Sequence, residues 1–144
     1  MKISASIYSN TTQSLSDTIK DLDEHQIDLF HVDCNDDVAV FDDISEIRKL
    51  SNKPIDLHII TDDPDKYFPL IAKHEIEYVT FQYENINGFL NVPDMISSKL
   101  GLAITSETDV SVFDAYSNRF SFILFMATTP GKSAGVFNKI NFQK

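Results

Sequence analysis

The chain has 144 residues, of which 42% are hydrophobic and 24% charged, a composition typical of one soluble globular domain and not of a disordered or collagen-like chain. Its formal net charge of −10 argues against nonspecific nucleic-acid binding, which needs a basic surface. The sequence shows neither a signal peptide nor an apolar run long enough to span a membrane, and its single cysteine, Cys34, allows no internal disulfide. We therefore expect one cytoplasmic domain over residues 1–144, with no nucleic-acid or membrane partner.

Short runs typical of β-strands alternate with segments of helical periodicity along the chain. The runs are Ile3–Tyr8, Ile27–Asp33, Ile55–Ile60, Glu77–Phe81, Gly101–Ile104 and Phe120–Met126. This alternation predicts repeated βα units and a parallel sheet. A spacing of roughly 25 residues per unit suits either a doubly wound sheet or a (β/α) barrel, and periodicity alone does not choose between them.

Three of the intervening segments carry explicit helix signals. In the first, the apolar residues of one stripe are Leu15, Ile19 and Leu22, as expected for a helix that covers a sheet. A later helix is predicted to begin with Asp63 as its N-cap and Pro64 at its first helical position. Another is predicted to begin at Thr108, with an inward face formed by Val112 and Phe113.

Histidine and aspartate recur two residues apart in neighbouring runs, as His31 and Asp33 and then as Asp56 and His58. Two residues is the strand period, so each pair points to one face. If the two runs are adjacent parallel strands about 5 Å apart, His31, Asp33 and His58 converge. These residue types predict a divalent-metal cluster with a carboxylate beside it, and the expected task of Asp56 is to orient a neighbour by hydrogen bonding.

At these residues the sequence resembles the ribulose-phosphate 3-epimerase family, whose members are (β/α)8 barrels that invert C3 of a pentulose 5-phosphate. Residues 31–37 are similar to the family's His-Val-Asp-Val-Met-Asp-Gly, and residues 54–60 to its Pro-Leu-Asp-Val-His-Leu-Met. Residues 63–67 match Asn-Pro-Asp-Arg-Tyr, residues 3–9 resemble the first strand with its Pro-Ser-Ile-Leu-Ser, and residues 124–131 resemble the sixth strand and its Met-Thr-Val-Asn-Pro-Gly loop. The matches follow one another in the family's order over almost the whole chain.

The resemblance implies an α/β fold of the TIM-barrel type with about six βα units in this chain. It implies that His31, Asp33 and His58 bind a divalent metal ion, with zinc expected and iron, manganese or cobalt as alternatives, and that Asp33 moves the proton. By the same resemblance, the substrate-binding residues are Ser6, Met126, Gly131 and Ser133. The implied partners are a small phosphosugar and further copies of the same chain.

The sequence also departs from the family's pattern. After Gly131 the family's Phe-Gly-Gly-Gln is replaced by Lys-Ser-Ala-Gly, and Gln82 stands where many members have histidine. The sequence stops at Lys144, where the sixth helix would begin, so we expect the last two strands and the second catalytic aspartate to be missing and this chain alone to be inactive. The leading interpretation is a C3 epimerase of pentulose 5-phosphates. The alternative is a catalytically inactive relative that acts as a phosphosugar-binding or regulatory module.

Three residues next to the motif have ordinary structural interpretations. Cys34 alternates away from the predicted site face and has no basic neighbour to lower its pKa, so we expect a core cysteine. Asp36 and Asp37 follow the strand and are expected to form a solvated turn. A compact doubly wound sheet stays open at this point as the alternative fold.

Overall fold

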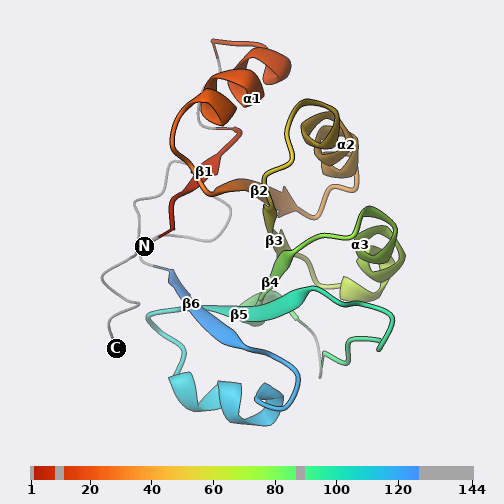
Figure 1. Cartoon of the computed structure of the whole chain (residues 1–144). Helices are drawn as coiled ribbons and strands as arrows, with labels where there is room; N and C mark the ends of the chain where they lie inside the picture. The colour runs from red at the N-terminus through yellow and green to blue at the C-terminus, as the bar shows by residue number, and fades with distance from the viewer. Residues whose placement is uncertain (1, 9–11, 87–89, 127–144) are drawn as a thin grey trace.

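A computed structural model describes residues 2–8, 12–86 and 90–126 of the chain. Within these ranges, six parallel strands form one sheet in the order of the sequence. The strands are β1 (Ser4–Ser6), β2 (Leu29–Asn35), β3 (Ile55–Ile60), β4 (Tyr78–Gln82), β5 (Lys99–Thr105) and β6 (Phe122–Met126). The sheet curls into a half-barrel with helices on its outer side (Figure 1). The predicted partial (β/α)8 barrel is confirmed, and the doubly wound alternative is wrong, because the strand order never reverses.

The helices follow the expected βα alternation, with differences in type at two of them. They are α1 (Leu15–Glu24), α2 (Val40–Leu50), α3 (Phe68–His74) and the 3₁₀ helices η1 (Pro64–Tyr67), η2 (Tyr83–Asn85) and η3 (Val110–Tyr116). In α1 the Ser14 side chain caps the first turn by accepting a hydrogen bond from the amide of Asp17 at 3.2 Å. Among the described residues, no helix is both long and apolar enough to cross a lipid bilayer.

The helix predicted from Asp63 onward is split. Pro64 opens the 3₁₀ turn η1, Asp63 makes no side-chain cap, and the α-helix starts only at Phe68. A second proline, Pro69, explains the delay, because a residue without an amide hydrogen is tolerated in the first turn of an α-helix but not in its interior.

The helix predicted at Thr108 is a 3₁₀ helix, η3, and its N-cap is Asp109. The Asp109 carboxylate accepts a hydrogen bond from the Ser111 amide at 2.9 Å, which satisfies a donor at the helix start. Val112 and Phe113 pack against the core, as the sequence predicts.

Two faces of the sheet have different chemistry. On β2, Phe30, Val32 and Cys34 are fully buried and pack with the core beneath the helices, which confirms Cys34 as a core cysteine. The alternating residues, His31 and Asp33 on β2, lie on the concave face. Parallel strands bring equivalent residues of neighbouring strands to the same face at the same height, so the concave face collects side chains from every strand.

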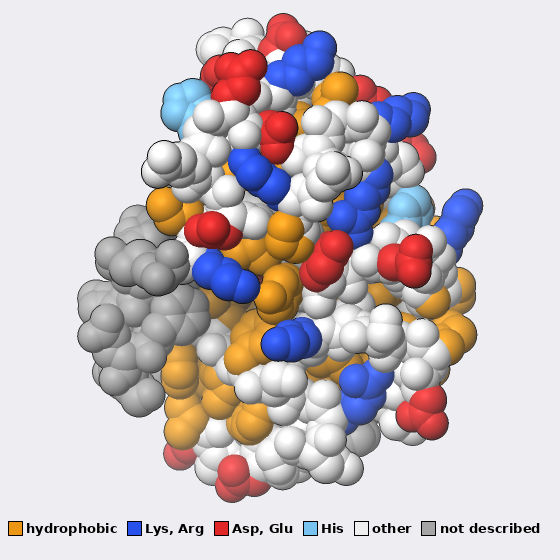
Figure 2. Space-filling model, viewed as in Figure 1, with side chains coloured by type: hydrophobic (Ala, Val, Ile, Leu, Met, Phe, Trp, Pro, Cys, Tyr) orange, Lys and Arg blue, Asp and Glu red, His pale blue; other side chains and the backbone are white. Residues whose placement is uncertain are grey.

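Part of the concave face is apolar. Figure 2 shows hydrophobic side chains gathered over the middle of the molecule, among lysine, arginine and acidic side chains. A hollow of about 260 Å³ is lined by Lys2, Leu29, Asp56, Tyr78, Thr80, Phe122 and Leu124.

Candidate metal centre

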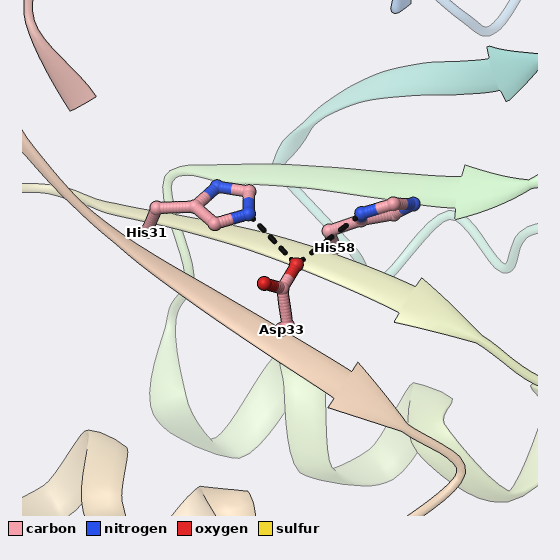
Figure 3. A group of neighbouring side chains, drawn as sticks. All are labelled: His31, Asp33 and His58. Atoms are coloured by element: carbon pink, nitrogen blue, oxygen red, sulfur yellow. Dashed lines mark hydrogen bonds and ion pairs between the residues drawn. The ribbon is translucent and has the colours of Figure 1, made fainter. Parts of the chain in front are cut away.

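The strand register brings the predicted histidines and aspartates together. His31 pairs with Asp56, and Asp33 pairs with His58, across the β2–β3 ladder. In Figure 3 the rings of His31 and His58 approach the Asp33 carboxylate from opposite sides. One donor atom from each of His31, Asp33 and His58 lies within 4.8 Å of the other two. The convergence that the two-residue spacing predicts is therefore present.

A single carboxylate oxygen is the centre of the cluster. Oδ1 of Asp33 lies 2.8 Å from Nε2 of His31 and 3.4 Å from Nδ1 of His58. The two imidazole rings lie with their centroids 6.2 Å apart and their planes tilted by 51°. His58 is almost completely buried, whereas His31 keeps 21% of its side chain exposed. The cluster is thus accessible from the side of His31.

The outer nitrogen of each imidazole has its own partner. Nδ1 of His31 lies 3.0 Å from Oδ2 of Asp56, and the same oxygen accepts a hydrogen bond from the Ser4 hydroxyl at 3.1 Å. Nε2 of His58 lies 2.8 Å from Oε1 of Gln82 at the end of β4. Such contacts fix the rotation of a ring and determine which nitrogen carries hydrogen. Asp56 therefore makes the orienting contact that the sequence predicts.

The sequence pattern does not predict the contact of Gln82 with His58; by resemblance, Gln82 is only a departure from the family's histidine. A signal was present. Thr80 pairs with His58 across the β3–β4 ladder, and Gln82 lies two residues farther along the same strand, hence on the same face. A polar residue on the concave face at the carboxyl end of the next strand is a candidate neighbour of the cluster.

The electrostatics of the cluster favour opposite charges on His31 and Asp33. Burial lowers the pKa of His31, but its hydrogen bonds with Asp33 and Asp56 outweigh burial and raise the pKa to about 10. Burial raises the pKa of Asp33, but the hydrogen bond with His31 and the nearby imidazole of His58 outweigh that effect and hold the pKa well below its ordinary range. In the metal-free protein an imidazolium therefore neutralises an ionised carboxylate.

The cluster fits a divalent metal ion by the chemistry of its donors. Two imidazoles and one carboxylate are a common protein ligand set for zinc and related metals, and they leave a coordination position open. The outer nitrogens are occupied by Asp56 and Gln82, so each ring presents its other nitrogen to Asp33. Three electron-rich atoms, one from each side chain, then face one point. Their lone pairs repel one another unless a cation or a proton lies between them.

The predicted substrate-binding residues lie at different distances from the cluster, and two of them are outside the described residues. Ser6 pairs with His31 across the β1–β2 ladder, and its hydroxyl accepts a hydrogen bond from the Tyr8 amide at 3.2 Å. Met126 ends β6, opposite Thr105, at the same carboxyl edge of the sheet but four strands away from β2. Gly131 and Ser133 lie outside the described residues.

Asp36 is exposed, as expected for a solvated turn, but it also has a structural task. Its Oδ1 accepts hydrogen bonds from the Thr61 hydroxyl at 2.8 Å and the Tyr67 hydroxyl at 3.0 Å, and Lys66 Nζ lies 2.8 Å away. Asp36 has a φ of 55°, in the left-handed region that aspartate tolerates better than most residues. Asp36 therefore connects the carboxyl end of β2 to the segment that follows β3.

Comparison with known proteins finds similarity to one family along almost the whole chain. A sequence profile described as the ribulose-phosphate 3 epimerase family matches residues 2–144. Curated proteins named ribulose-phosphate 3-epimerase are similar to the chain: that of Aquifex aeolicus is 27% identical over 119 residues, covering 76% of this chain and 54% of that protein. That of Bacillus subtilis is 25% identical over 140 residues, covering 91% and 64%, and that of Methanocaldococcus jannaschii is 26% identical over 153 residues, covering 100% and 64%. The chain thus spans less than two thirds of the length of these relatives.

Proposed function

The chain belongs to the ribulose-phosphate 3-epimerase family, and we propose that it acts in metal-assisted epimerisation at C3 of a pentulose 5-phosphate. The observation that carries the proposal is the convergence of His31 Nε2, Asp33 Oδ1 and His58 Nδ1 on the concave face of the half-barrel. In barrels of this kind, catalytic residues stand at the carboxyl ends of the strands, and the cluster lies toward those ends on β2 and β3.

We assign His31, Asp33 and His58 as the residues that hold the metal ion, with zinc as the proposed ion and iron, manganese or cobalt as alternatives. When bound, a divalent ion supplies Lewis acidity for an oxygen next to C3, which makes the C3 hydrogen more acidic. Asp56 and Gln82 contribute by holding the outer nitrogens of the two imidazoles.

Asp33 is the proposed base. Its low pKa keeps the carboxylate ionised at neutral pH, which is the form that accepts a proton. Both imidazole contacts fall on Oδ1, so we assign Oδ2 as the atom that takes the proton from C3. Inversion of the carbon also requires an acid on its opposite face, so the test below measures proton removal and inversion separately.

The remaining assignments complete the proposal. Ser6, Met126, Gly131 and Ser133 are proposed to contact the phosphosugar, of which Ser6 stands next to His31 in the register. A homo-oligomeric assembly and a cytoplasmic location also belong to this proposal.

The first test is metal binding. We expect the metal-free chain to bind one equivalent of Zn²⁺ in a calorimetric titration, and the His31→Ala and His58→Ala variants to lose that binding. His25→Ala is the matched control, because His25 is an exposed histidine at the end of α1. Tight binding that neither cluster variant changes would reject the site.

The second test follows C3 of ribulose 5-phosphate by NMR in deuterated water with the metal-loaded chain. Formation of xylulose 5-phosphate supports the epimerase and requires a second acid. Exchange at C3 without product, abolished in an Asp33→Asn variant that still binds Zn²⁺, identifies Asp33 as a working base without a partner acid. Binding of the sugar with neither exchange nor product supports the alternative, an inactive phosphosugar-binding relative.

A further inference from the structure

A hydrogen-bonded chain extends from the metal centre to the surface through Gln82. Gln82 ends β4 and is 1% exposed. Its Oε1 lies 2.8 Å from Nε2 of His58, and its Nε2 donates to Oε1 of Glu84 at 2.6 Å. Gln82 is therefore a buried amide between an imidazole and a carboxylate.

Glu84 is held in place from its other side. Its Oε2 accepts hydrogen bonds from the Thr105 amide at 2.9 Å and from the Thr108 hydroxyl. Burial raises the pKa of Glu84, but these hydrogen bonds and the one from Gln82 outweigh it and lower the pKa, so the side chain is ionised at neutral pH. Glu84 lies in η2, is held there by Thr105 at the carboxyl end of β5, and presents a fixed, negatively charged acceptor to Gln82.

The direction of every hydrogen bond in the chain follows from this charge. An ionised carboxylate only accepts hydrogen bonds, so Gln82 has to present its NH₂ group to Glu84 and its oxygen to His58. An amide oxygen also only accepts, so Nε2 of His58 has to carry hydrogen. The lone pair of a neutral His58 is then on Nδ1, which lies 3.4 Å from Oδ1 of Asp33. The hydrogen bond that this oxygen accepts comes from Nε2 of His31 at 2.8 Å.

We propose that Glu84 is a positioning residue that, through Gln82, sets the tautomer of His58 so that Nδ1 faces the metal centre with its lone pair. The value of this tautomer for catalysis rests on the function proposed above, but the tautomer itself is a property of the metal-free chain. The inference assigns Glu84 no contact with substrate.

The two histidines of the cluster are oriented by different means. His31 has a carboxylate, Asp56, directly on its outer nitrogen, and this contact contributes to the raised pKa of His31. The outer nitrogen of His58 contacts the neutral amide of Gln82, and the Glu84 carboxylate lies one hydrogen bond beyond that amide. Gln82 therefore transmits the orientation imposed by Glu84 without placing a second negative charge against a ring that is almost fully buried.

The variant Glu84→Gln tests the inference with little change of shape. The Thr105 amide donates to Oε2, so the new amide has to keep its oxygen there and turn its NH₂ group toward Gln82. Gln82 must then rotate its own amide by half a turn and offer NH₂ to His58. We expect the neutral His58 ring to change from the Nε2–H to the Nδ1–H tautomer.

The measurement is the pair of imidazole ¹⁵N chemical shifts of His58 in the metal-free chain, at a pH where the ring is neutral, because the nitrogen that carries hydrogen resonates well upfield of the one that does not. Glu107→Gln is the matched control, since it removes the same charge from an exposed residue two positions from Thr105, and it should leave the tautomer unchanged. Zn²⁺ affinity should fall ~10–100-fold in Glu84→Gln, as for loss of other partners of metal-binding histidines.

Each outcome decides the inference. The Nε2–H tautomer of His58 in the wild type, changed to Nδ1–H in Glu84→Gln, supports the inference. The Nδ1–H tautomer in the wild type overturns it, and this result does not depend on whether a variant folds. An unchanged tautomer in Glu84→Gln also overturns it. The expected change of the His58 tautomer in a chain that binds no Zn²⁺ supports the role of Glu84 and rejects the metal-dependent function. Zn²⁺ binding that depends on His31 and His58, with no change of tautomer in Glu84→Gln, supports the metal-dependent function and rejects the role of Glu84.

Discussion

The ring of Phe122 on β6 lies against the backbone of Gly101 on β5, in the space that a side chain at position 101 would need. The two residues are paired in the register, and a Cβ added at Gly101 would lie 2.1 Å from Cε2 of Phe122. Glycine at this position therefore leaves the space that the aromatic ring of Phe122 occupies on the concave face.

Replacing Gly101 by alanine should destabilise the chain by about 1–3 kcal/mol, because the Phe122 ring has to leave its position. The free energy of unfolding in urea measures the effect. In a Phe122→Ala background the same substitution should cost clearly less, as a double-mutant cycle would show. Equal costs in the two backgrounds would mean that the ring is not what excludes alanine.

The raised pKa of His31 predicts a titration at high pH. In the metal-free chain, NMR should show His31 losing its proton near pH 10, and Asp56→Asn should lower this pKa by removing one of the two carboxylates. Asp42→Asn, an equal charge change at an exposed residue of α2, serves as the control. Saturating Zn²⁺ should abolish the titration, because a ligand nitrogen cannot keep its proton.

The same shift sets the sign of a stability change. A group whose pKa is higher in the folded than in the unfolded chain stabilises the fold below its ordinary pKa, about 6.5 for histidine. This contribution should be lost as the pH rises from about 6.5 through about 10, the pKa of folded His31. The free energy of unfolding of the metal-free chain should therefore fall over this interval, and less steeply in Asp56→Asn.

Ionisation of Asp36 should account for part of the fall in the free energy of unfolding at low pH. Hydrogen bonds with Lys66, Thr61 and Tyr67 lower its pKa to about 2, so its contribution is present above its ordinary pKa, about 3.9, and is lost as the pH falls toward 2. Asp36→Asn should flatten the acid limb of the unfolding free energy, whereas Asp62→Asn, at an exposed neighbour, should not. Asp36→Ala should be less stable than Asp36→Asn at neutral pH, because alanine tolerates the φ of 55° less well.

Tyr8 and Asp43 should stabilise the fold as a pair. The Tyr8 hydroxyl donates to Oδ2 of Asp43 at 2.6 Å and so connects the end of β1 to α2. Tyr8→Phe should lower the free energy of unfolding by about 1.5–3 kcal/mol, the usual range for a hydrogen bond to a charged group. A double-mutant cycle with Asp43→Asn gives the control, and additive effects would show that the two side chains do not stabilise each other. Burial, and then Asp43, raise the pKa of Tyr8, so its tyrosinate absorbance should appear only at strongly alkaline pH.

The cluster could be predicted because its pattern is local. His31 and Asp33 share a face by the strand period, and a helix between parallel strands makes Asp56 and His58 their neighbours. The type of helix after β3 and β5 was less accessible, because the 3₁₀ form of η1 depends on how Pro64 and Pro69 divide the segment. Residue periodicity does not distinguish one short helix from two.

The amino-acid sequence by itself determined the order of βα units, the face on which each polar pair lies and the chemistry of the His31, Asp33 and His58 donors. Only the tertiary structure decided the partners that complete the site. Gln82 contacts His58 and Glu84 contacts Gln82, because the sheet curls and the β4–β5 ladder brings Thr105 within reach of Glu84. Alternation along a strand specifies a face, but which side chains meet on that face depends on register and curvature, which arise when residues distant in sequence pack together.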